Sequence, residues 1–432
     1  MKRKFTNKLE YWKEHNIKMP LMVIGARQIG KTYIIDEFCR ENFREYIYIN
    51  LEKEEKIQSI FENTLDPEEI IKYIEINYSK NIDIENTIIF FDEIQVSERA
   101  ITSLKYFCES ERPYKIVCAG SLLGVKLNRF KSSFPVGKVI IENMYPLDFE
   151  EFLLAKGREK LIEEIKNCFN KKVKILDSIH EIAINEYKEY LCIGGMPKAV
   201  LNYLENDCKV VSFDRSIHEN IINAYIADMR KYVYTAEESI KIQNIYETMP
   251  IQLGKDNRKF KYSVMEKGAT RKNYELPLDW LVASNMLIKC TKVNFIQVPL
   301  KAYQDIESFK MYISDVGLLN YLAKVKFSDI ILESEFMFKG AITENYVAQA
   351  LISKKYDLYY WKSKSEAEVD FVLDKEDGII PIEVKASTTT KSKSLNEYIQ
   401  KFNPNYAIRV SAKNFGFYNN IFSVPLYAVF LI

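Results

Sequence analysis

The stretch that decides the fold of the N-terminal part is Gly25-Ala26-Arg27-Gln28-Ile29-Gly30-Lys31-Thr32, which matches the pattern G-x-x-x-x-G-K-[ST]. It follows a short apolar run at Leu21–Ile24 and precedes a helical pattern over residues 33–43. In this context, backbone N–H groups curl around phosphate oxygens. We therefore predict a nucleotide site, with the Lys31 amine on the β- and γ-phosphates and the Thr32 hydroxyl on Mg²⁺.

The segments around this loop alternate between strand and helix patterns. Apolar or β-branched runs occur at Tyr46–Leu51, Thr87–Phe91 and Lys115–Ala119, with helical segments between them. Runs that are apolar on both faces are typical of a buried parallel sheet. We expect an α/β fold, with this first unit ending near Pro146.

Polar residues follow two of these apolar runs. Asp92 and Glu93 come directly after Thr87–Phe91, and Ser121 follows the next strand. An acid in the first position holds the Mg²⁺ shell in P-loop enzymes, and a second acid is placed to activate an attacking water. We therefore interpret Asp92 as a metal-site residue and Glu93 as a catalytic base. Ser121 is interpreted either as a γ-phosphate sensor or as a turn residue.

Charge on the transferred phosphate requires a cation. The candidates are Arg129 and Lys138 after the Ser121 strand, and Arg27 inside the loop. A donor from another subunit is a further alternative, so the sequence leaves this assignment open.

Three further regions follow the first unit. Apolar residues at helical spacing predict a helical region over 148–235, interrupted at Gly194-Gly195-Met196-Pro197. Short helices and an alternating run at Met286–Val293 suggest a winged-helix-like module over 236–334. Residues 335–432 predict one helix and then strands, the last at Val424–Phe430. The expected domains are therefore 1–147, 148–235, 236–334 and 335–432.

The last region contains a second chemical pattern. Asp370 lies in one alternating strand, and Glu383 and Lys385 lie in the next, on the same face. Glu344 lies on the preceding helix. Clustered carboxylates bind Mg²⁺ or Mn²⁺, and a lysine beside them can orient a metal-bound water. We predict Glu344, Asp370 and Glu383 as metal ligands, with Asp370, Glu383 and Lys385 catalytic; the alternative is a salt-bridged sheet face.

A basic stretch follows Lys385. It contains Lys391, Lys393, Lys401, Arg409 and Lys413 against one acid, Glu397. Such a patch attracts a phosphate backbone, although a solvated lysine-rich loop has the same composition. Bound DNA or RNA is thus one expectation for this region.

The composition narrows the class of protein. The 432 residues are 47% apolar and carry 61 basic and 60 acidic side chains, so the protein is globular and nucleic-acid contact must be local. No apolar run is long enough to span a membrane. Seven scattered cysteines, without a C-x-x-C pair, fit reduced thiols in a cytoplasmic protein.

The two sites, in this order, resemble a family of prokaryotic AAA-like P-loop ATPases that end in a domain of unknown function 4143. The matching segments are GARQIGKT, YINLE (48–52), IIFFDEIQ (88–95), AGSLL (119–123), YPLDFEEFL (145–153), YLCIGGMPKAV (190–200), SDVGLL (314–319), GAITENYVAQAL (340–351), EVDFVL (368–373) and IEVKAS (382–387).

This resemblance implies an AAA-type nucleotide domain, a helical region with a winged-helix-like module, and a C-terminal domain similar to PD-(D/E)-x-K nucleases. Many relatives have a G-R pair after the Ser121 strand, where this sequence has Gly137-Lys138. That departure places Lys138 where those relatives have the arginine, so this position does not supply an arginine finger.

We therefore expect an enzyme that binds and hydrolyses ATP with Mg²⁺ and is coupled to a nuclease-like, nucleic-acid-directed domain. One alternative is a nucleotide-dependent switch that binds nucleic acid or protein without cleaving. A small-molecule kinase is another, but it uses neither Glu93 nor the last hundred residues. Monomer, dimer and ring all remain open.

Overall fold

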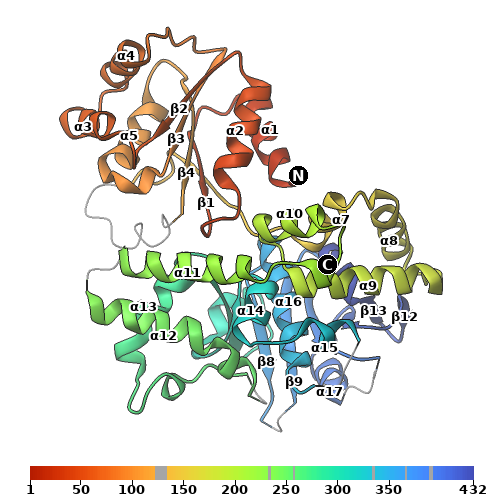
Figure 1. Ribbon diagram of the computed structural model, residues 1–432. Coiled ribbons are helices and arrows are strands. Elements are labelled where there is room, and N and C mark those ends of the chain that lie inside the picture. The colour runs from red at the N-terminus through yellow and green to blue at the C-terminus, as the bar shows by residue number, and fades with distance from the viewer. Residues whose placement is uncertain (122–133, 232–234, 256–257, 333–335, 365–366, 389–392) are drawn as a thin grey trace. The chain divides into compact units, whose positions relative to one another are not determined.

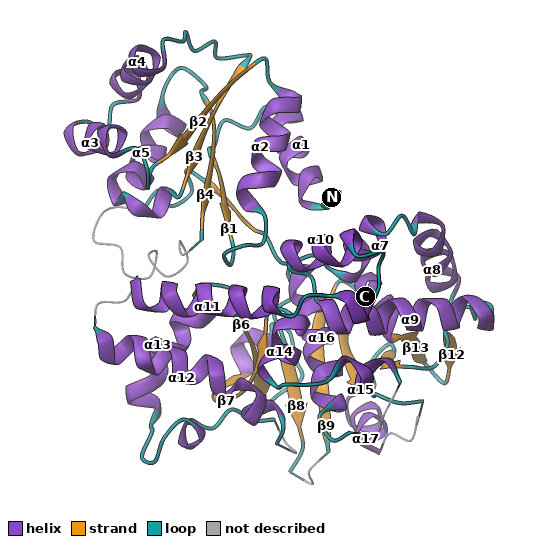
Figure 2. Cartoon of the chain, viewed as in Figure 1, coloured by secondary structure: helices purple, strands orange, loops and turns teal. Residues whose placement is uncertain are grey.

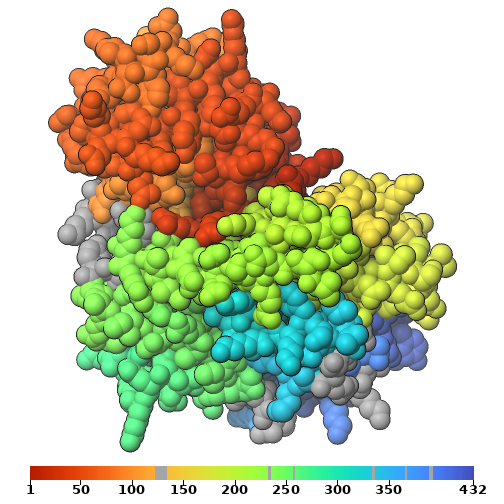
Figure 3. All heavy atoms as spheres, viewed as in Figure 1, coloured from red at the N-terminus to blue at the C-terminus, as the bar shows by residue number. Residues whose placement is uncertain are grey.

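The computed structural model describes residues 1–121, 134–231, 235–255, 258–332, 336–364, 367–388 and 393–432. The chain forms two compact units (Figure 1). The N-terminal unit contains Lys2–Tyr145 with the short segment Ala283–Asn285, and the C-terminal unit contains Pro146–Val282 and Met286–Ile432. In the space-filling view the N-terminal unit runs from red to orange (Figure 3).

The N-terminal unit is built on a five-stranded parallel sheet in the order β2-β3-β4-β1-β5. Its strands are β1 (Leu21–Ile24), β2 (Glu45–Asn50), β3 (Thr87–Asp92), β4 (Lys115–Gly120) and β5 (Ile140–Asn143). Every residue of β1, β3 and β4 is buried. The parallel sheet predicted from these apolar runs is confirmed.

Helices cover this sheet on both faces (Figure 2). Helices α1 (Phe5–Glu14) and α2 (Lys31–Asn42) pack together, and α2 contacts the sheet. Helices α3 (Glu55–Asn63), α4 (Pro67–Tyr78) and α5 (Glu98–Glu109) pack against one another within the core that β2 and β3 share. Asp66 caps α4 by accepting hydrogen bonds from two backbone N–H groups of its first turn.

The C-terminal unit begins with a run of helices. A capping box between Asp148 and Glu151 starts the first of them. The helices are α7 (Phe149–Ala155), α8 (Glu159–Lys171), α9 (Asp177–Ile193), α10 (Pro197–Glu205), α11 (Ser216–Lys231), α12 (Ala236–Leu253) and α13 (Arg271–Ala283). The predicted helical region is thus present.

The rest of this unit is organised around an eight-stranded mixed sheet in the order β12-β13-β11-β10-β9-β8-β6-β7. Its strands are β6 (Leu287–Val293), β7 (Gln304–Ile313), β8 (Tyr359–Lys362), β9 (Glu368–Lys375), β10 (Gly378–Val384), β11 (Ala407–Ser411), β12 (Gly416–Tyr418) and β13 (Ile421–Pro425). The associated helices are α14 (Val316–Leu322), α15 (Phe327–Ile331), α16 (Lys339–Ser353) and α17 (Lys393–Phe402).

Two observations refine the expectations for this unit. The strands β6 and β7, expected in a winged-helix-like module, lie in the same sheet as the strands of the last region, because β6 pairs in parallel with β8. The strand predicted over Val424–Phe430 is wrong beyond Pro425, since Leu426–Leu431 form a buried 3-10 helix. A continuous apolar run shows only that a segment is buried, which both structures satisfy.

Among the described helices, none combines the length and the hydropathy that a membrane crossing requires.

Candidate functional site

The first candidate site lies where three strands of the N-terminal sheet end. Strand β4 lies between β1 and β3, and all three run parallel. Their carboxyl ends therefore meet at one edge of the sheet, where open α/β sheets bind ligands. The loop 25–30 leaves β1 at this edge, Ser121 follows β4, and Asp92 and Glu93 stand at the end of β3.

The loop after β1 has the backbone of a phosphate-binding turn. Gly25, Gln28 and Gly30 all have positive φ, at 148°, 63° and 90°. A side chain at Gly25 would overlap the backbone carbonyl of Met144, so this position requires glycine. The predicted loop therefore has the conformation that its sequence pattern indicated.

The Lys31 amine lies within the loop. Lys31 is the first residue of α2 and is only 8% exposed. Its Nζ donates to the carbonyl oxygens of Gly25 (2.9 Å) and Ala26 (2.7 Å). These neutral acceptors hold the charge near the loop, and phosphate oxygens would be stronger, charge-assisted partners for the amine.

Thr32 and Asp92 are in direct contact. The Thr32 hydroxyl donates to Oδ2 of Asp92 over 3.1 Å, and Asp92 is 4% exposed. The Tyr48 hydroxyl, from β2, donates to the same oxygen over 2.9 Å. Burial raises the pKa of Tyr48 to about 12, so this group stays a donor at neutral pH. A hydroxyl beside a buried carboxylate is a donor set that suits Mg²⁺.

Glu93 is held in an unusual backbone conformation. Its φ is 52°, in the left-handed region, and its N–H donates to Oδ1 of Asp92 over 3.0 Å. Its carboxylate accepts a hydrogen bond from the side-chain amide of Gln95, which is fully buried. Residues other than glycine in the left-handed region cluster at functional sites.

The predicted cations have different surroundings. Arg27 Nε donates to the Ser121 hydroxyl over 3.4 Å, which joins two predicted site residues. Lys138 forms an ion pair with Glu109 at 3.1 Å. Arg129 lies outside the described residues. Of the described candidates, Arg27 is thus the one that contacts another predicted site residue.

Sequence reasoning missed three residues of this site. The Tyr48 hydroxyl donates to Asp92, and the Gln95 amide donates to Glu93. Gln95 stands two positions after Glu93, which was a usable signal, whereas Tyr48 stands 44 positions before Asp92 and had none. Arg3 holds the loop from the N-terminus, since its guanidinium donates to the carbonyls of Ile29 (3.0 Å) and Tyr145 (2.6 Å). No local pattern marks Arg3.

The second candidate site, in the C-terminal unit, is organised around a buried lysine. Lys310, on β7, is 1% exposed. Its Nζ lies 3.0 Å from Oε1 of Glu344, 2.6 Å from Oε1 of Glu368 and 3.9 Å from Oδ1 of Asp370. Neither Lys310 nor Glu368 was among the predicted site residues.

Glu344 has two further partners. The Tyr312 hydroxyl donates to its Oε1 over 2.6 Å, and Arg258 forms an ion pair with its Oε2. Glu344 is therefore a buried carboxylate whose Oε1 accepts two hydrogen bonds, from Lys310 and Tyr312, and whose Oε2 has the Arg258 ion pair but no hydrogen bond from a described residue. Such compensation is what a buried charge needs in the absence of other ligands.

Asp370 and Glu383 lie on the two strands of one antiparallel hairpin, and Lys385 directly follows its second strand. Strands β9 and β10 pair with Ile382 opposite Phe371, and Asp370 Oδ2 accepts a hydrogen bond from Val384 N over 2.8 Å. Lys385 Nζ lies 3.2 Å from Oε1 of Glu383, which confirms that the two side chains share a face. Arg409 Nε lies 3.9 Å from the other oxygen of Glu383.

This arrangement does not fit the predicted metal site. Within the described part of the chain, no three His, Cys, Asp or Glu side chains are grouped so that they could hold a metal ion. Glu344 and Asp370 both face the Lys310 amine, and Glu383 pairs with Lys385 and Arg409. The geometry is that of the salt-bridged alternative, and we derive no metal-dependent step from it.

A third cluster explains the glycine-rich break after α9. Gly195 donates its N–H to Oδ2 of Asp315 (2.6 Å) and accepts at its carbonyl from Leu147 N (2.7 Å). A side chain at Gly194 would overlap Asp315, one at Gly195 would overlap the Leu147 backbone, and one at Gly317 would overlap the Ile193 carbonyl. The two segments GGMP and DVGLL are thus packed backbone to backbone.

Three models of known domains match parts of the chain. Residues 18–153 match the model of an AAA domain, residues 184–329 that of a domain of unknown function 8612, and residues 339–429 that of a domain of unknown function 4143. No curated protein matches the chain. The AAA match contains the loop 25–32, Asp92, Glu93 and Ser121.

Solved structures similar to the chain include a Walker-type ATPase of Pyrococcus abyssi, which is 14% identical with a TM-score of 0.45. That comparison covers 74% of this chain and 95% of the other. The ORC2 protein of Aeropyrum pernix, with ADPNP and ADP, is 11% identical with a TM-score of 0.37, covering 77% of this chain and 94% of that one.

Proposed function

We propose that this chain, which contains an AAA domain and a domain of unknown function 4143, binds and hydrolyses Mg-ATP at the edge of its N-terminal sheet. The observation that carries this proposal is the contact between Thr32 and Asp92 beside the buried Lys31 amine. It joins the two halves of a nucleotide–metal site from segments 60 positions apart in the sequence.

Each residue has a distinct role in this proposal. The loop 25–30 and Lys31 bind the phosphates, and Thr32 and Asp92 hold the metal. Bound Mg²⁺ supplies positive charge that offsets the charge of the phosphate oxygens. Glu93 accepts the proton of the attacking water once its carboxylate leaves Gln95, and Ser121 and Arg27 face the phosphate from β4 and the loop.

Purified full-length protein tests this function. Phosphate release from ATP should require Mg²⁺ and should be lost in Lys31→Ala, because a charge-assisted contact worth about 1.5–3 kcal/mol is removed. The matched control is Lys72→Ala, an exposed lysine of α4. Equal activity in both variants would reject the site.

For the C-terminal unit, the contacts of Lys310 favour a non-cleaving module that binds nucleic acid or protein and is controlled by the nucleotide state. The amine lies among Glu344, Glu368 and Asp370, where a nuclease would need a metal ion. Two of the basic residues predicted to contact phosphates already have partners within the protein. Arg409 forms an ion pair with Glu383, and the Lys401 amine lies over the Trp361 ring.

A contiguous network supports control by the nucleotide state. The chain leaves the N-terminal unit at Tyr145 and, two residues later, Leu147 bonds to Gly195. Gly195 bonds to Asp315, and the next residue, Val316, bonds through its N–H to Gln349 on α16. Glu344 lies on the same helix. A shift of Leu147 can therefore be transmitted, through these hydrogen bonds, to the acidic residues around Lys310.

Cleavage and binding assays separate the two functions. The protein should bind single- or double-stranded DNA or RNA, or a protein partner, in a nucleotide-dependent way. It should release no nuclease products with Mg²⁺ or Mn²⁺. Metal-dependent cleavage that Lys385→Ala abolishes, with ATP hydrolysis intact, would instead establish the nuclease predicted from Asp370, Glu383 and Lys385.

A further inference from the structure

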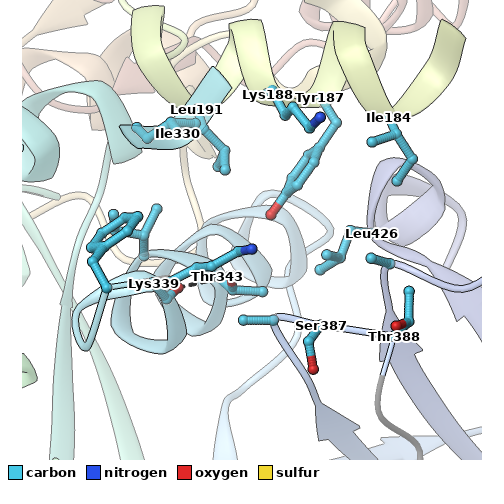
Figure 4. A pocket seen from close by; sticks show the side chains of 14 residues that line it. Ile184, Tyr187, Lys188, Leu191, Ile330, Lys339, Thr343, Ser387, Thr388 and Leu426 are labelled. Atoms are coloured by element: carbon cyan, nitrogen blue, oxygen red, sulfur yellow. Dashed lines mark hydrogen bonds between the residues drawn. The ribbon is translucent and has the colours of Figure 1, made fainter. Parts of the chain in front are cut away.

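The C-terminal unit contains a cavity that neither candidate site uses. It has a volume of about 220 Å³ and lies between α9, α16 and the segments that follow β10 and β11 (Figure 4). Apolar side chains form much of its wall, among them Leu191, Ile330, Phe336, Ile342 and Leu426. All lining residues belong to one compact unit.

The polar groups that line the cavity are donors. Two side chains of the lining have amines, those of Lys188 and Lys339. Four have hydroxyls: Tyr187, Thr343, Ser387 and Thr388. None of the described lining residues is acidic. Protonated amines donate only, and hydroxyls can donate. A pocket with this lining is suited to an anion.

Lys339 lies at a helix N-terminus, a position that disfavours a positive charge. It is the first residue of the 15-residue helix α16, whose first turn contains no acid and whose N-cap makes no side-chain hydrogen bond. Helix N-termini favour negative charge, so an amine here adds to an existing positive potential. The half-buried Lys339 amine forms no ion pair with any described residue.

Tyr187 provides a second, independent observation. Its side chain is 4% exposed. Burial raises the pKa of its hydroxyl and the nearby Thr343 hydroxyl lowers it in part, but no described residue forms a hydrogen bond of normal geometry with it. Figure 4 shows this hydroxyl, from α9, pointing toward the end of Lys339 across the cavity. A buried hydroxyl without a partner is costly, so a ligand acceptor between the two groups would satisfy it.

We propose that this cavity binds a small organic anion, with its carboxylate or phosphate group between Lys339 and Tyr187 and an apolar body against Leu191, Phe336 and Ile342. The apolar wall excludes a bare inorganic ion as the best ligand, since burial of apolar surface adds to the charge-assisted contact. The site is separate from the nucleotide loop, which lies in the other unit.

Calorimetric titration of the full chain, with Mg-ADP present to occupy the nucleotide loop, tests this site. The probes are phenyl phosphate and benzoate; benzyl alcohol has the ring without the charge, and inorganic phosphate has charge without the ring. We expect at least one of the two charged aromatic probes to bind more tightly than both controls. The one that binds identifies the oxyanion group.

Variants then locate the binding. Lys339→Met should weaken it about tenfold by removing the charged donor, and Tyr187→Phe by about threefold. Lys326→Met, at an exposed lysine outside the lining, is the matched control and should bind as wild type. Melting temperatures without probe show that each variant folds.

Three outcomes would overturn the site: no binding of either charged probe to wild type, equal binding to Lys339→Met, or benzyl alcohol binding as tightly as the charged probes. Loss of ATP hydrolysis in Lys31→Ala bears on the nucleotide site alone, so the two proposals fail separately.

Discussion

The hydroxyl of Tyr48 donates a hydrogen bond to Oδ2 of Asp92 over 2.9 Å, and the same oxygen accepts a second hydrogen bond from the Thr32 hydroxyl over 3.1 Å. One carboxylate oxygen therefore joins β2, β3 and the start of α2. Because the two donors hold it from different elements, the position of Asp92 depends on both. Tyr48 is in this sense a positioning residue for the carboxylate that we propose as a metal ligand.

Replacing Tyr48 with phenylalanine should raise the Mg²⁺ concentration needed for half-maximal ATP hydrolysis. The lost hydrogen bond is worth about 0.5–1.5 kcal/mol, which corresponds to a change of about two- to thirteenfold. ATP binding measured in EDTA should stay unchanged, because Tyr48 touches the acid and not the loop.

Tyr46→Phe is the matched control for that variant. Tyr46 lies on the same strand, and its hydroxyl also donates to an aspartate, Asp36, over 3.0 Å. Asp36 is outside the site, so the Mg²⁺ dependence should remain that of wild type. Identical behaviour of the two variants would show that Tyr48 does not position Asp92.

Glu93→Gln should bind ATP normally and hydrolyse it at least about 100-fold more slowly, because the amide cannot accept a proton from water. Single-turnover assays with labelled ATP and equilibrium binding measure the two properties separately. The control is Glu111→Gln, at an exposed glutamate beyond α5. Wild-type turnover in Glu93→Gln would remove its role as base.

Gly195→Ala should lower the free energy of unfolding by about 2 kcal/mol or more, since the added methyl overlaps the Leu147 backbone. Gly416→Ala is the control, because a Cβ there meets no atom within 4 Å. Urea unfolding compares the two. If both variants are equally stable, the close packing of GGMP against residue 147 is not what holds this region, and a hinge role would gain support.

His218 should make the protein less stable in acid. Burial lowers the pKa of His218 to about 4, and its Nε2 lies 2.9 Å from the Ile193 carbonyl. Between pH 6.5 and 4 the unfolded chain binds a proton that the folded chain does not, so the free energy of unfolding falls as pH falls. The full effect is about 3 kcal/mol.

The measurement is the free energy of unfolding of wild type and His218→Asn at several pH values from 7.5 to 4. The variant starts lower, but the difference between the two proteins should shrink toward acid pH. Other groups, including Asp315, whose pKa burial raises to about 6, titrate in both proteins and largely cancel. Parallel curves would contradict a buried neutral His218.

Glu344→Gln should destabilise the C-terminal unit by about 3 kcal/mol, because it leaves the buried Lys310 with less compensating charge. Glu275→Gln, which breaks an exposed pair with Arg271 on α13, should change the stability far less, because water screens the pair. Denaturant unfolding of both variants compares them. A small and equal loss would mean that the acids are not a structural cluster.

Several features were predictable from the sequence because they are local or follow from the regular period of a strand. The loop 25–32 is eight consecutive residues, and its shape follows from where the glycines stand. Asp92 and Ser121 meet the loop because parallel strands end at one edge of a sheet. Glu383 and Lys385 share a face because side chains alternate along a strand.

The tertiary structure alone decided what these residues touch. Lys310 reaches Glu344 from 34 positions away, and Tyr48 reaches Asp92 across a strand pair whose order no local pattern states. The cavity beside Lys339 exists only because α9 packs over α16. Contacts between distant segments depend on the order of strands in the sheet and on how the helices pack. Burial of apolar surface drives both, and local residue spacing does not reveal them. The sequence therefore predicted which chemical groups are present, and the tertiary structure determined which groups they contact.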